Sequence, residues 1–147
     1  MSSIMIDIFK SLGRSDALAL REEAKNLTGT QIIASEHCIP AWSADKDYSS
    51  WPVGSPVTDE GQVWTLIQPH NASYYTGRPS ELRALWGLTH TKDPAKAKPW
   101  VSPFGTSGMY MMDECYKAED GKVYRCKFDN TVFNFDAHPA GWEELTI

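Results

Sequence analysis

The residue types that most often carry catalysis or bind metals are present in this chain, but their spacing does not suit those tasks. Zinc sites draw their ligands from short, characteristic spacings, and no two histidines share one. A glycosidase needs two carboxylates facing each other across a cleft, whereas the acidic pairs here fall at predicted turn tips, where acidic residues are favoured anyway. The histidines are His37, His70, His90 and His138, and the acidic pairs are Asp59 with Glu60 and Glu119 with Asp120. The sequence therefore predicts neither a metal site nor a hydrolase.

The remaining catalytic motifs are also incomplete. The stretch GTSG at 105–108 lacks both the lysine and the spacing of a phosphate-binding loop. Ser107 with a histidine partner is a conceivable nucleophile, but GTSGM is not the GxSxG turn that presents a catalytic serine. We therefore predict a protein without enzymatic activity and without a cofactor.

Composition and charge limit the partners. The 147 residues carry a formal net charge of −5, so no basic patch is implied and nucleic acid is not an expected partner. The same sign argues against binding to anionic membrane surfaces, and no run of about 18 apolar residues is present to cross a bilayer. The N-terminal stretch carries Asp7 inside its apolar run without a basic region ahead of it, unlike a signal peptide. We expect a protein that is made in a cytoplasm and is not exported by the general route.

The first thirty residues have the pattern of a short helix. Ser15 is a plausible N-cap and Gly29 follows the last periodic residue, as at many helix ends. One narrow apolar stripe runs along this helix, at Ala17, Leu20, Ala24 and Leu27. The apolar run IMIDIF at 4–9 precedes it and fits either a strand or a helix. The stripe is too narrow to fold alone, so it either packs on its own domain or meets copies of the chain or a larger assembly.

An internal repeat follows, in which each copy predicts a β-hairpin. DEGQVWTLIQPHN at 59–71 aligns with EDGKVYRCKFDNT at 119–131, and each copy has a tyrosine upstream and a closing tryptophan downstream. Asp120-Gly121 is a strong two-residue turn signal and Glu60-Gly61 a weaker one. A third short strand that ends near the closing tryptophan has to cover each hairpin, because two strands alone are not stable. The large apolar anchors of the two copies, expected in the cores, are Trp64 with Trp86 and Tyr124 with Trp142.

These elements together predict a mainly β fold. After an N-terminal helical segment at 1–30, it contains two small three-stranded antiparallel modules, the first module at 31–91 and the second module at 109–147. The stretch 92–108, KDPAKAKPWVSPFGTSG, holds three prolines and two glycines and is predicted to be a linker or an ordered irregular loop.

The cysteines are Cys38, Cys115 and Cys126, an odd count without CxxC spacing, which argues against a zinc site and a disulfide framework. A two-residue turn at Asp120-Gly121 places Cys115 opposite Cys126 in a hydrogen-bonded pair. The Cβ atoms of opposed residues lie about 4.5–5.5 Å apart, which is wider than the roughly 3.5–4.5 Å of a disulfide. We therefore predict neighbouring free thiols on the core face.

The order of tyrosine, strand, turn glycine, V-[YW] and closing tryptophan resembles the small chitin-binding modules of bacterial chitinases, which are carbohydrate-binding families five and twelve. The second copy, DECYKAEDGKVYRCKFDNTVFNFDAHPAGWEEL, is similar to phage-encoded versions of that module, while the first has a longer insert, NASYYTGRPSELRA. The whole chain is similar to small proteins of prophage tail and host-recognition regions in Gram-positive bacteria.

The resemblance implies a non-enzymatic virion protein, associated with the tail or fibre, that binds a glycan of the host cell surface. In the family, an aromatic pair after the second strand stacks on sugar rings, and the corresponding residues here are Tyr74, Tyr75, Phe133 and Phe135. The alternative is a purely structural decoration or adaptor protein that binds other virion proteins. By analogy with phage fibres, we expect a homo-oligomer, with a trimer preferred and the first thirty residues at or near the contact.

Overall fold

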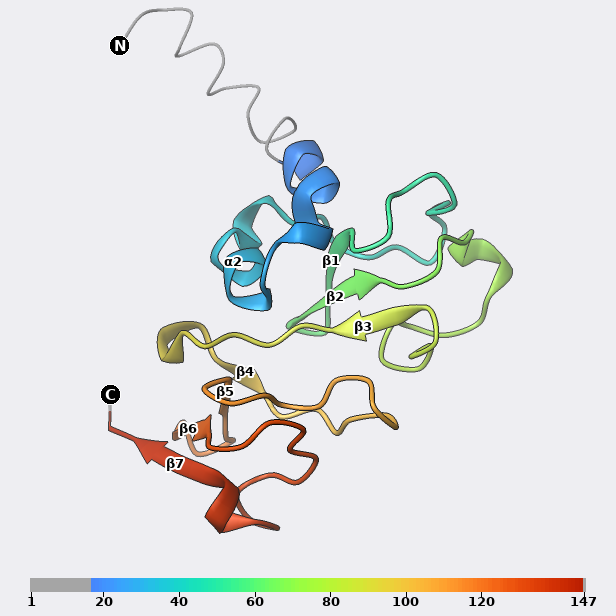
Figure 1. Cartoon of the computed structure of the whole chain (residues 1–147). Helices are drawn as coiled ribbons and strands as arrows, with labels where there is room; N and C mark the ends of the chain where they lie inside the picture. Colours follow the sequence, from blue (N-terminus) through green and yellow to red (C-terminus); the bar gives the residue numbers. More distant parts are fainter. Residues whose placement is uncertain (1–16, 147) are drawn as a thin grey trace, which may run out of the picture.

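The structure is a computed structural model, and it describes residues 17–146. Helical turns come first, in a helix over 17–23 and in η1 (Ala24–Asn26), α2 (Gly29–Ala34) and η2 (Glu36–Cys38). The first module then contributes β1 (Pro56–Asp59), β2 (Gln62–Leu66), η3 (Ala72–Tyr74) and β3 (Trp86–Leu88). The rest of the chain forms η4 (Pro94–Lys96), β4 (Lys98–Pro99), β5 (Cys115–Lys117), β6 (Val123–Cys126), η5 (Pro139–Gly141) and β7 (Trp142–Leu145). The helical turns lie above the first sheet, and the second sheet lies below it (Figure 1).

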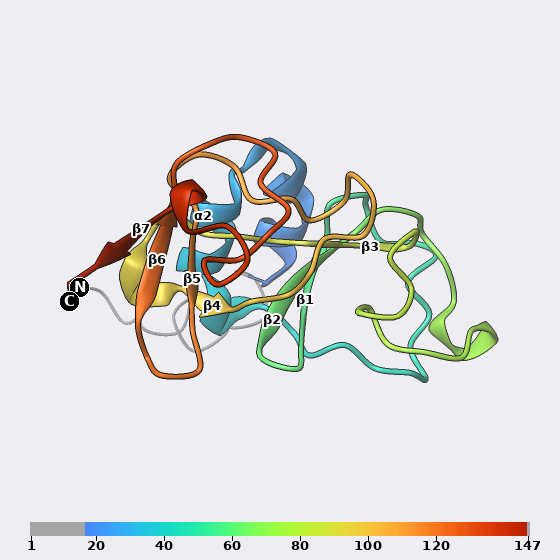
Figure 2. The same ribbon diagram turned by 90° about the horizontal axis from the view of Figure 1, so that it is seen from below.

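The predicted mainly β architecture is confirmed. The first sheet is antiparallel in the order β1-β2-β3, and the second has the order β4-β5-β6-β7. Both third strands begin at the predicted closing tryptophans, Trp86 and Trp142. The second sheet has one strand more than expected, because β4, from the stretch predicted to be a linker, pairs parallel with β5. Figure 2 shows β4 to β7 side by side.

The N-terminal helix ends earlier than the sequence suggested. Gly29 was expected to follow its last turn, but Gly29 opens α2 instead. Thr28 caps α2 in a capping box, in which its hydroxyl accepts from Gln31 N and the Gln31 side chain accepts from Thr28 N. That box is the T-x-x-Q pattern typical of a helix start. Ser15 and the apolar run at 4–9 lie outside the described residues. Among the described residues, no helix has both the length and the apolar character needed to cross a bilayer.

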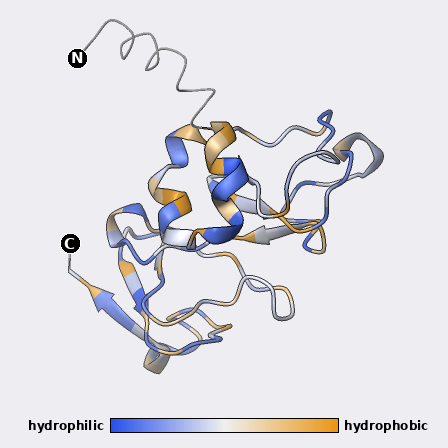
Figure 3. Cartoon of the chain, turned by 45° about the horizontal axis from the view of Figure 1, so that its top comes forward, coloured by the Kyte–Doolittle hydropathy of each residue, from blue (hydrophilic) through white to orange (hydrophobic). Residues whose placement is uncertain are grey.

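The apolar stripe of the N-terminal helix packs on the chain's own first module. Ala24 is buried in a cluster with Ile32, Ile33, Ile39 and Val63, and Leu20 and Leu27 pack against it. Figure 3 shows apolar and polar bands alternating around these helical turns. Of the two alternatives, packing within the domain accounts for this part of the stripe. The expected oligomer remains a prediction that no longer needs the stripe as its contact.

The two cores repeat one aromatic arrangement, as the repeat predicted. In the first module, Tyr48 meets Trp86 edge-on, with ring centroids 5.2 Å apart. In the second module, Tyr110 meets Trp142 edge-on at 5.3 Å. The predicted anchors Trp64 and Tyr124 are buried as well. The tyrosine of each module is also tied to the chain beyond its hairpin, because Tyr48 N donates to His70 O and Tyr110 N donates to Thr131 O.

The turn with the weaker sequence signal, Glu60-Gly61, is the two-residue turn, and the turn with the stronger signal, Asp120-Gly121, is longer. Asp59 pairs with Gln62, so Glu60-Gly61 is the two-residue turn, and both residues have positive φ, at 53° and 75°. The Asp120-Gly121 turn is a three-residue loop over 119–121, because Ala118 N donates to Lys122 O across it and Gly121 N donates to Ala118 O. A loop of this length takes a glycine at its last, left-handed position, and Gly121 has a φ of 88°.

The register argument for the cysteines is therefore wrong. The extra loop residue shifts the pairing by one, so that Cys115 lies opposite Arg125 and Cys126 lies opposite Trp142 in the next strand. All three cysteines are free thiols, and Cys115 and Cys126 are buried. A one-residue change of register moves every partner along the strand, so a single misread turn residue was enough to misplace the pair.

The Glu60 turn provides a test of this assignment. Glutamate is disfavoured at positive φ, whereas Asn-Gly is the preferred sequence of such a turn. Replacing Glu60 with asparagine should therefore stabilise the protein by about 0.5–1 kcal/mol in urea denaturation. Glu119→Asn in the three-residue loop is the matched control and should change stability less, because Glu119 does not have positive φ. An equal gain from both substitutions would contradict the assignment.

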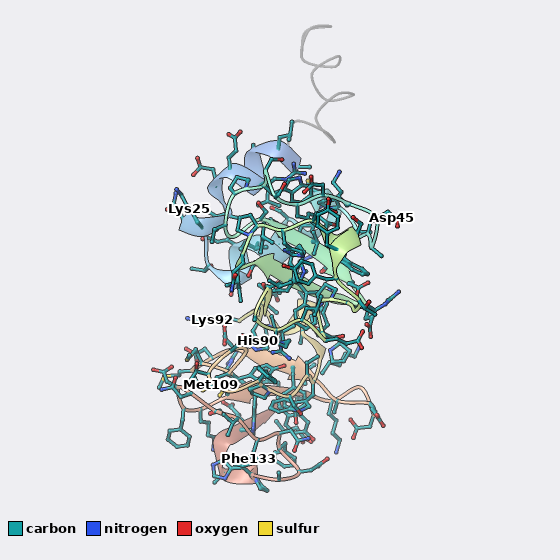
Figure 4. The ribbon with its side chains drawn as sticks, turned by 90° about the vertical axis from the view of Figure 1, so that its right-hand side faces the viewer. Lys25, Asp45, His90, Lys92, Met109 and Phe133 are labelled. Carbon is teal, nitrogen blue, oxygen red and sulfur yellow. The ribbon has the colours of Figure 1, made fainter. Side chains whose placement is uncertain are left out.

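The two modules meet along a joint of specific contacts. His90 of the first module stacks on Tyr110 of the second, with ring centroids 3.6 Å apart, and its Nε2 lies 2.9 Å from Gly108 O. Gln62 Nε2 donates to Pro99 O, and an isolated bridge pairs Thr91 with Cys115. Figure 4 shows His90 at the waist between the two modules. These contacts make the second module part of one folded body with the first.

Candidate functional site

The four aromatic residues predicted to bind sugar are not brought together. Tyr74 and Tyr75 lie at and just after η3 of the first module, 82% and 47% exposed, and Phe133 is 60% exposed on the second. Figure 4 places Phe133 at the end of the molecule away from the N-terminal helical turns. Phe135 packs inward, with its ring stacked on Tyr124 at 4.4 Å. Three of the four are therefore available to a ligand, and the fourth supports the core.

A groove of about 790 Å³ opens beside Phe135 on the second module. Its lining comes from β4 and the residue after it, from the β5–β6 hairpin, and from the loop before β7. We call it the aromatic groove, and its lining residues are Pro99, Trp100, Tyr116, Lys117, Ala118, Glu119, Asp120, Tyr124, Asn134 and Asp136. A volume of this size suits a ligand of several ring units.

The aromatic groove has one available ring and a floor of tyrosines. Phe135, Tyr124 and Tyr116 form a stacked column, with neighbouring centroids 4.4 Å and 5.4 Å apart. Tyr124 is buried between these contacts, so it offers little open ring surface to a ligand. Trp100, like Phe135, is partly buried against the core of the second module. It stacks on Tyr110 at 4.8 Å with the planes 10° apart, and unlike Phe135 it lines the groove. Trp100 is therefore the side chain that can offer a flat apolar surface there.

Polar groups share the lining of the groove with this ring. Glu119, Asp120 and Asp136 are exposed, and Asn134 and Lys117 complete the polar lining. The Tyr116 hydroxyl accepts a hydrogen bond from Phe135 N at 2.9 Å, which holds the loop before β7 against the floor. Burial raises the pKa of Tyr116, and the nearby Asp136 and Asp120 carboxylates raise it further. The tyrosine therefore remains a neutral hydroxyl beside a negatively charged rim.

The expectation that the acidic turn tips have no cleft is wrong for the second hairpin. Glu119 and Asp120 line the aromatic groove together with Asp136. Asp120 Oδ1 also accepts from Lys122 N, so this carboxylate shapes the turn as well. In the first module, Asp59 and Glu60 line a separate open hollow with Glu36 and His37. The structure thus brings the two neighbouring carboxylates of this turn and Asp136, from the loop before β7, to one groove.

Sequence reasoning missed Trp100, because it lies in the stretch predicted to be a linker. The β4 pairing of Lys98 with Tyr116 brings the residues that follow against the hairpin. The signal available was a tryptophan after KAKP, since a flexible linker has little use for a large aromatic ring. Asn134, between the two predicted phenylalanines, does line the aromatic groove.

Two smaller hollows lie elsewhere. One of about 270 Å³ is lined by Phe128, Asp129, Phe133 and His138 among others, and Phe133 faces it. The other, of about 370 Å³, lies at the joint between the modules, beside His90 and Glu114. Among residues 17–146, no group of three or more His, Cys, Asp or Glu side chains is placed to hold a metal ion.

Comparison with known proteins adds no assignment to this geometry. No protein-family model matches the sequence, and no curated protein matches it. The function is therefore argued from the aromatic groove itself.

Proposed function

We propose that this chain is a non-enzymatic carbohydrate-binding protein that holds a bacterial surface glycan in the aromatic groove. The observation that carries the proposal is Trp100, a partly exposed indole in a groove that also presents tyrosines, carboxylates, an amide and a lysine. Sugars present an apolar ring face and a rim of hydroxyls, and pockets that orient ligands combine apolar surface with a few placed polar groups. The aromatic groove offers both.

Binding is favoured over catalysis by the surroundings of the carboxylates. A glycosidase keeps one carboxyl protonated near neutral pH, which requires an apolar or charge-paired environment for that group. Glu119, Asp120 and Asp136 are all exposed, so water surrounds each of them. We therefore assign these groups to ligand contact rather than to bond cleavage.

A place in a phage particle, at the tail or fibre, is part of the same proposal and rests on the resemblance of the modules. The alternative, an adaptor that binds other virion proteins, is favoured by a different observation. Phe128 and Phe133 are 56% and 60% exposed beside one hollow, and exposed apolar side chains that gather in one place often mark protein contacts. A homo-oligomer, preferably a trimer, fits both functions.

The proposal is tested by retention of the full chain on purified Gram-positive cell walls. Trp100→Ala should weaken retention by roughly tenfold to thirtyfold, because an aromatic anchor of a binding site commonly contributes about 2 kcal/mol. Trp100→Phe should lose less, because it keeps a ring. The full chain is used because residues 20–27 cover the apolar cluster of α2. Trp100 also packs against the core of the second module, so circular dichroism and urea denaturation of both variants have to separate lost binding from lost folding.

The matched comparison is the triple variant Tyr74→Ala, Tyr75→Ala and Phe133→Ala, which removes the exposed aromatics predicted from the resemblance. It should reduce retention less than Trp100→Ala does. Loss of retention in the triple variant alone would move the glycan site to those residues. Retention that survives in both would place the wall-binding site outside these residues and overturn the aromatic groove as the site. A parent protein that is not retained on the walls would contradict glycan binding and favour the adaptor function.

A further inference from the structure

The rim of the aromatic groove is strongly unbalanced in charge. Three of its side chains are carboxylates, Glu119, Asp120 and Asp136, and only Lys117 is positively charged. The nearest further lysine of the hairpin, Lys122, is already paired with Glu144, 3.2 Å away. The carboxylates therefore face the groove without a matching set of cations.

The carboxylates also affect Tyr116 on the floor of the groove. Besides burial, the Asp136 and Asp120 carboxylates raise the pKa of Tyr116, which places both within electrostatic reach of the buried hydroxyl. Trp100 adds to this preference, because the face of an indole ring attracts cations. Carboxylates and an indole in one groove favour a ligand with positive charge over a neutral or negative one.

We infer that the aromatic groove selects glycans that carry free, protonated amino groups, such as glucosamine units, over N-acetylated or acidic sugars. This inference rests on the proposed function and names the sugar class of the same site. An ammonium group on a sugar bound in the groove would share it with Trp100 and the three carboxylates, whereas an acetamide has no charge to offer them. A uronic acid would be repelled by all three.

The experiment compares three oligosaccharides of equal length with the full chain. These are a glucosamine hexamer, an N-acetylglucosamine hexamer and a hyaluronan hexasaccharide, each titrated by calorimetry and by tryptophan fluorescence. The glucosamine hexamer should bind roughly tenfold more tightly than the N-acetylated one at low salt, because exposed charge pairs contribute little individually but act together here. The preference should shrink in 0.5 M salt, where the screening length is only about 4 Å, and hyaluronan should bind most weakly.

A triple variant that removes the three carboxylates tests whether they cause the selectivity; it combines Glu119→Gln, Asp120→Asn and Asp136→Asn. In this variant the affinity ratio between glucosamine and N-acetylglucosamine hexamers should fall to about one. The matched control, Glu22→Gln, Glu23→Gln and Asp45→Asn, removes as many charges from exposed positions outside the groove and should keep the ratio.

The outcomes separate this inference from the proposed function. Equal or tighter binding of the N-acetylated or acidic hexamer overturns the charge selectivity while glycan binding stands. An unchanged ratio in the groove variant places the selectivity elsewhere and also overturns the inference. Failure of all three sugars to bind overturns the proposed function together with the inference.

Discussion

Replacing Trp142 with alanine should destabilise the protein by about 4 kcal/mol, because truncating a buried tryptophan leaves a large cavity. Trp142 is buried among Tyr116, Tyr110 and Trp100, with ring centroids 4.7, 5.3 and 5.9 Å away. Its indole N–H also donates to Phe133 O at 2.8 Å, so truncation leaves that carbonyl without its partner. The measurement is urea denaturation followed by far-ultraviolet circular dichroism.

The control for this prediction is Phe133→Ala, which removes an exposed ring from the same loop and should cost less than about 0.5 kcal/mol. Trp142→Phe should fall between the two, because it keeps a ring but loses the indole N–H. We expect one cooperative transition in all cases, since the stacking of His90 on Tyr110 and the bond of Gln62 to Pro99 O join the modules. A loss below 1 kcal/mol, or two separate transitions, would contradict this account of the core and the joint.

The second large effect is a loss of folding stability in acid, caused by His90. Burial lowers the pKa of His90 from 6.5 to about 4; the hydrogen bond to Gly108 O opposes this shift, and nearby Arg83 adds to it. Between these two values the unfolded chain binds a proton on His90 and the folded protein does not. The contribution of His90 to stability is therefore fully present above pH 6.5 and decreases as the pH falls toward 4. The expected loss is on the order of 3 kcal/mol.

The effect of His90 is isolated by comparison with His90→Gln, which can still donate to Gly108 O. Urea denaturation at pH 7 and pH 4 should show a fall in stability for the parent protein that is about 3 kcal/mol larger than for the variant. Carboxyl groups that titrate in the same range are present in both proteins. Subtracting the fall in stability of the variant from that of the parent protein therefore removes their contribution. An equal fall in stability in the two proteins would show that protonation of His90 does not destabilise the folded protein.

Elements with local signals could be predicted from the sequence alone. Gly61 and Gly121 marked both hairpin turns, because only certain residues tolerate positive φ there. The repeat placed Trp64, Tyr124, Trp86 and Trp142 in the cores, where each is buried, because large apolar residues recurring at equivalent positions have to be covered. Exposure of Tyr74 and Phe133 also agrees with their location in loops.

The candidate site and the exact strand pairing could not be predicted, because both depend on contacts between distant parts of the chain. The second hairpin has a three-residue loop that its Asp-Gly sequence does not distinguish from a two-residue turn, so the cysteine register could not be read from the turn. Trp100 enters the aromatic groove through the parallel pairing of β4 with β5, and Asp136 meets Asp120 there from the loop before β7. Each depends on contacts between residues distant in the sequence, whose free energy comes from burial in the folded chain and leaves no periodic pattern along it.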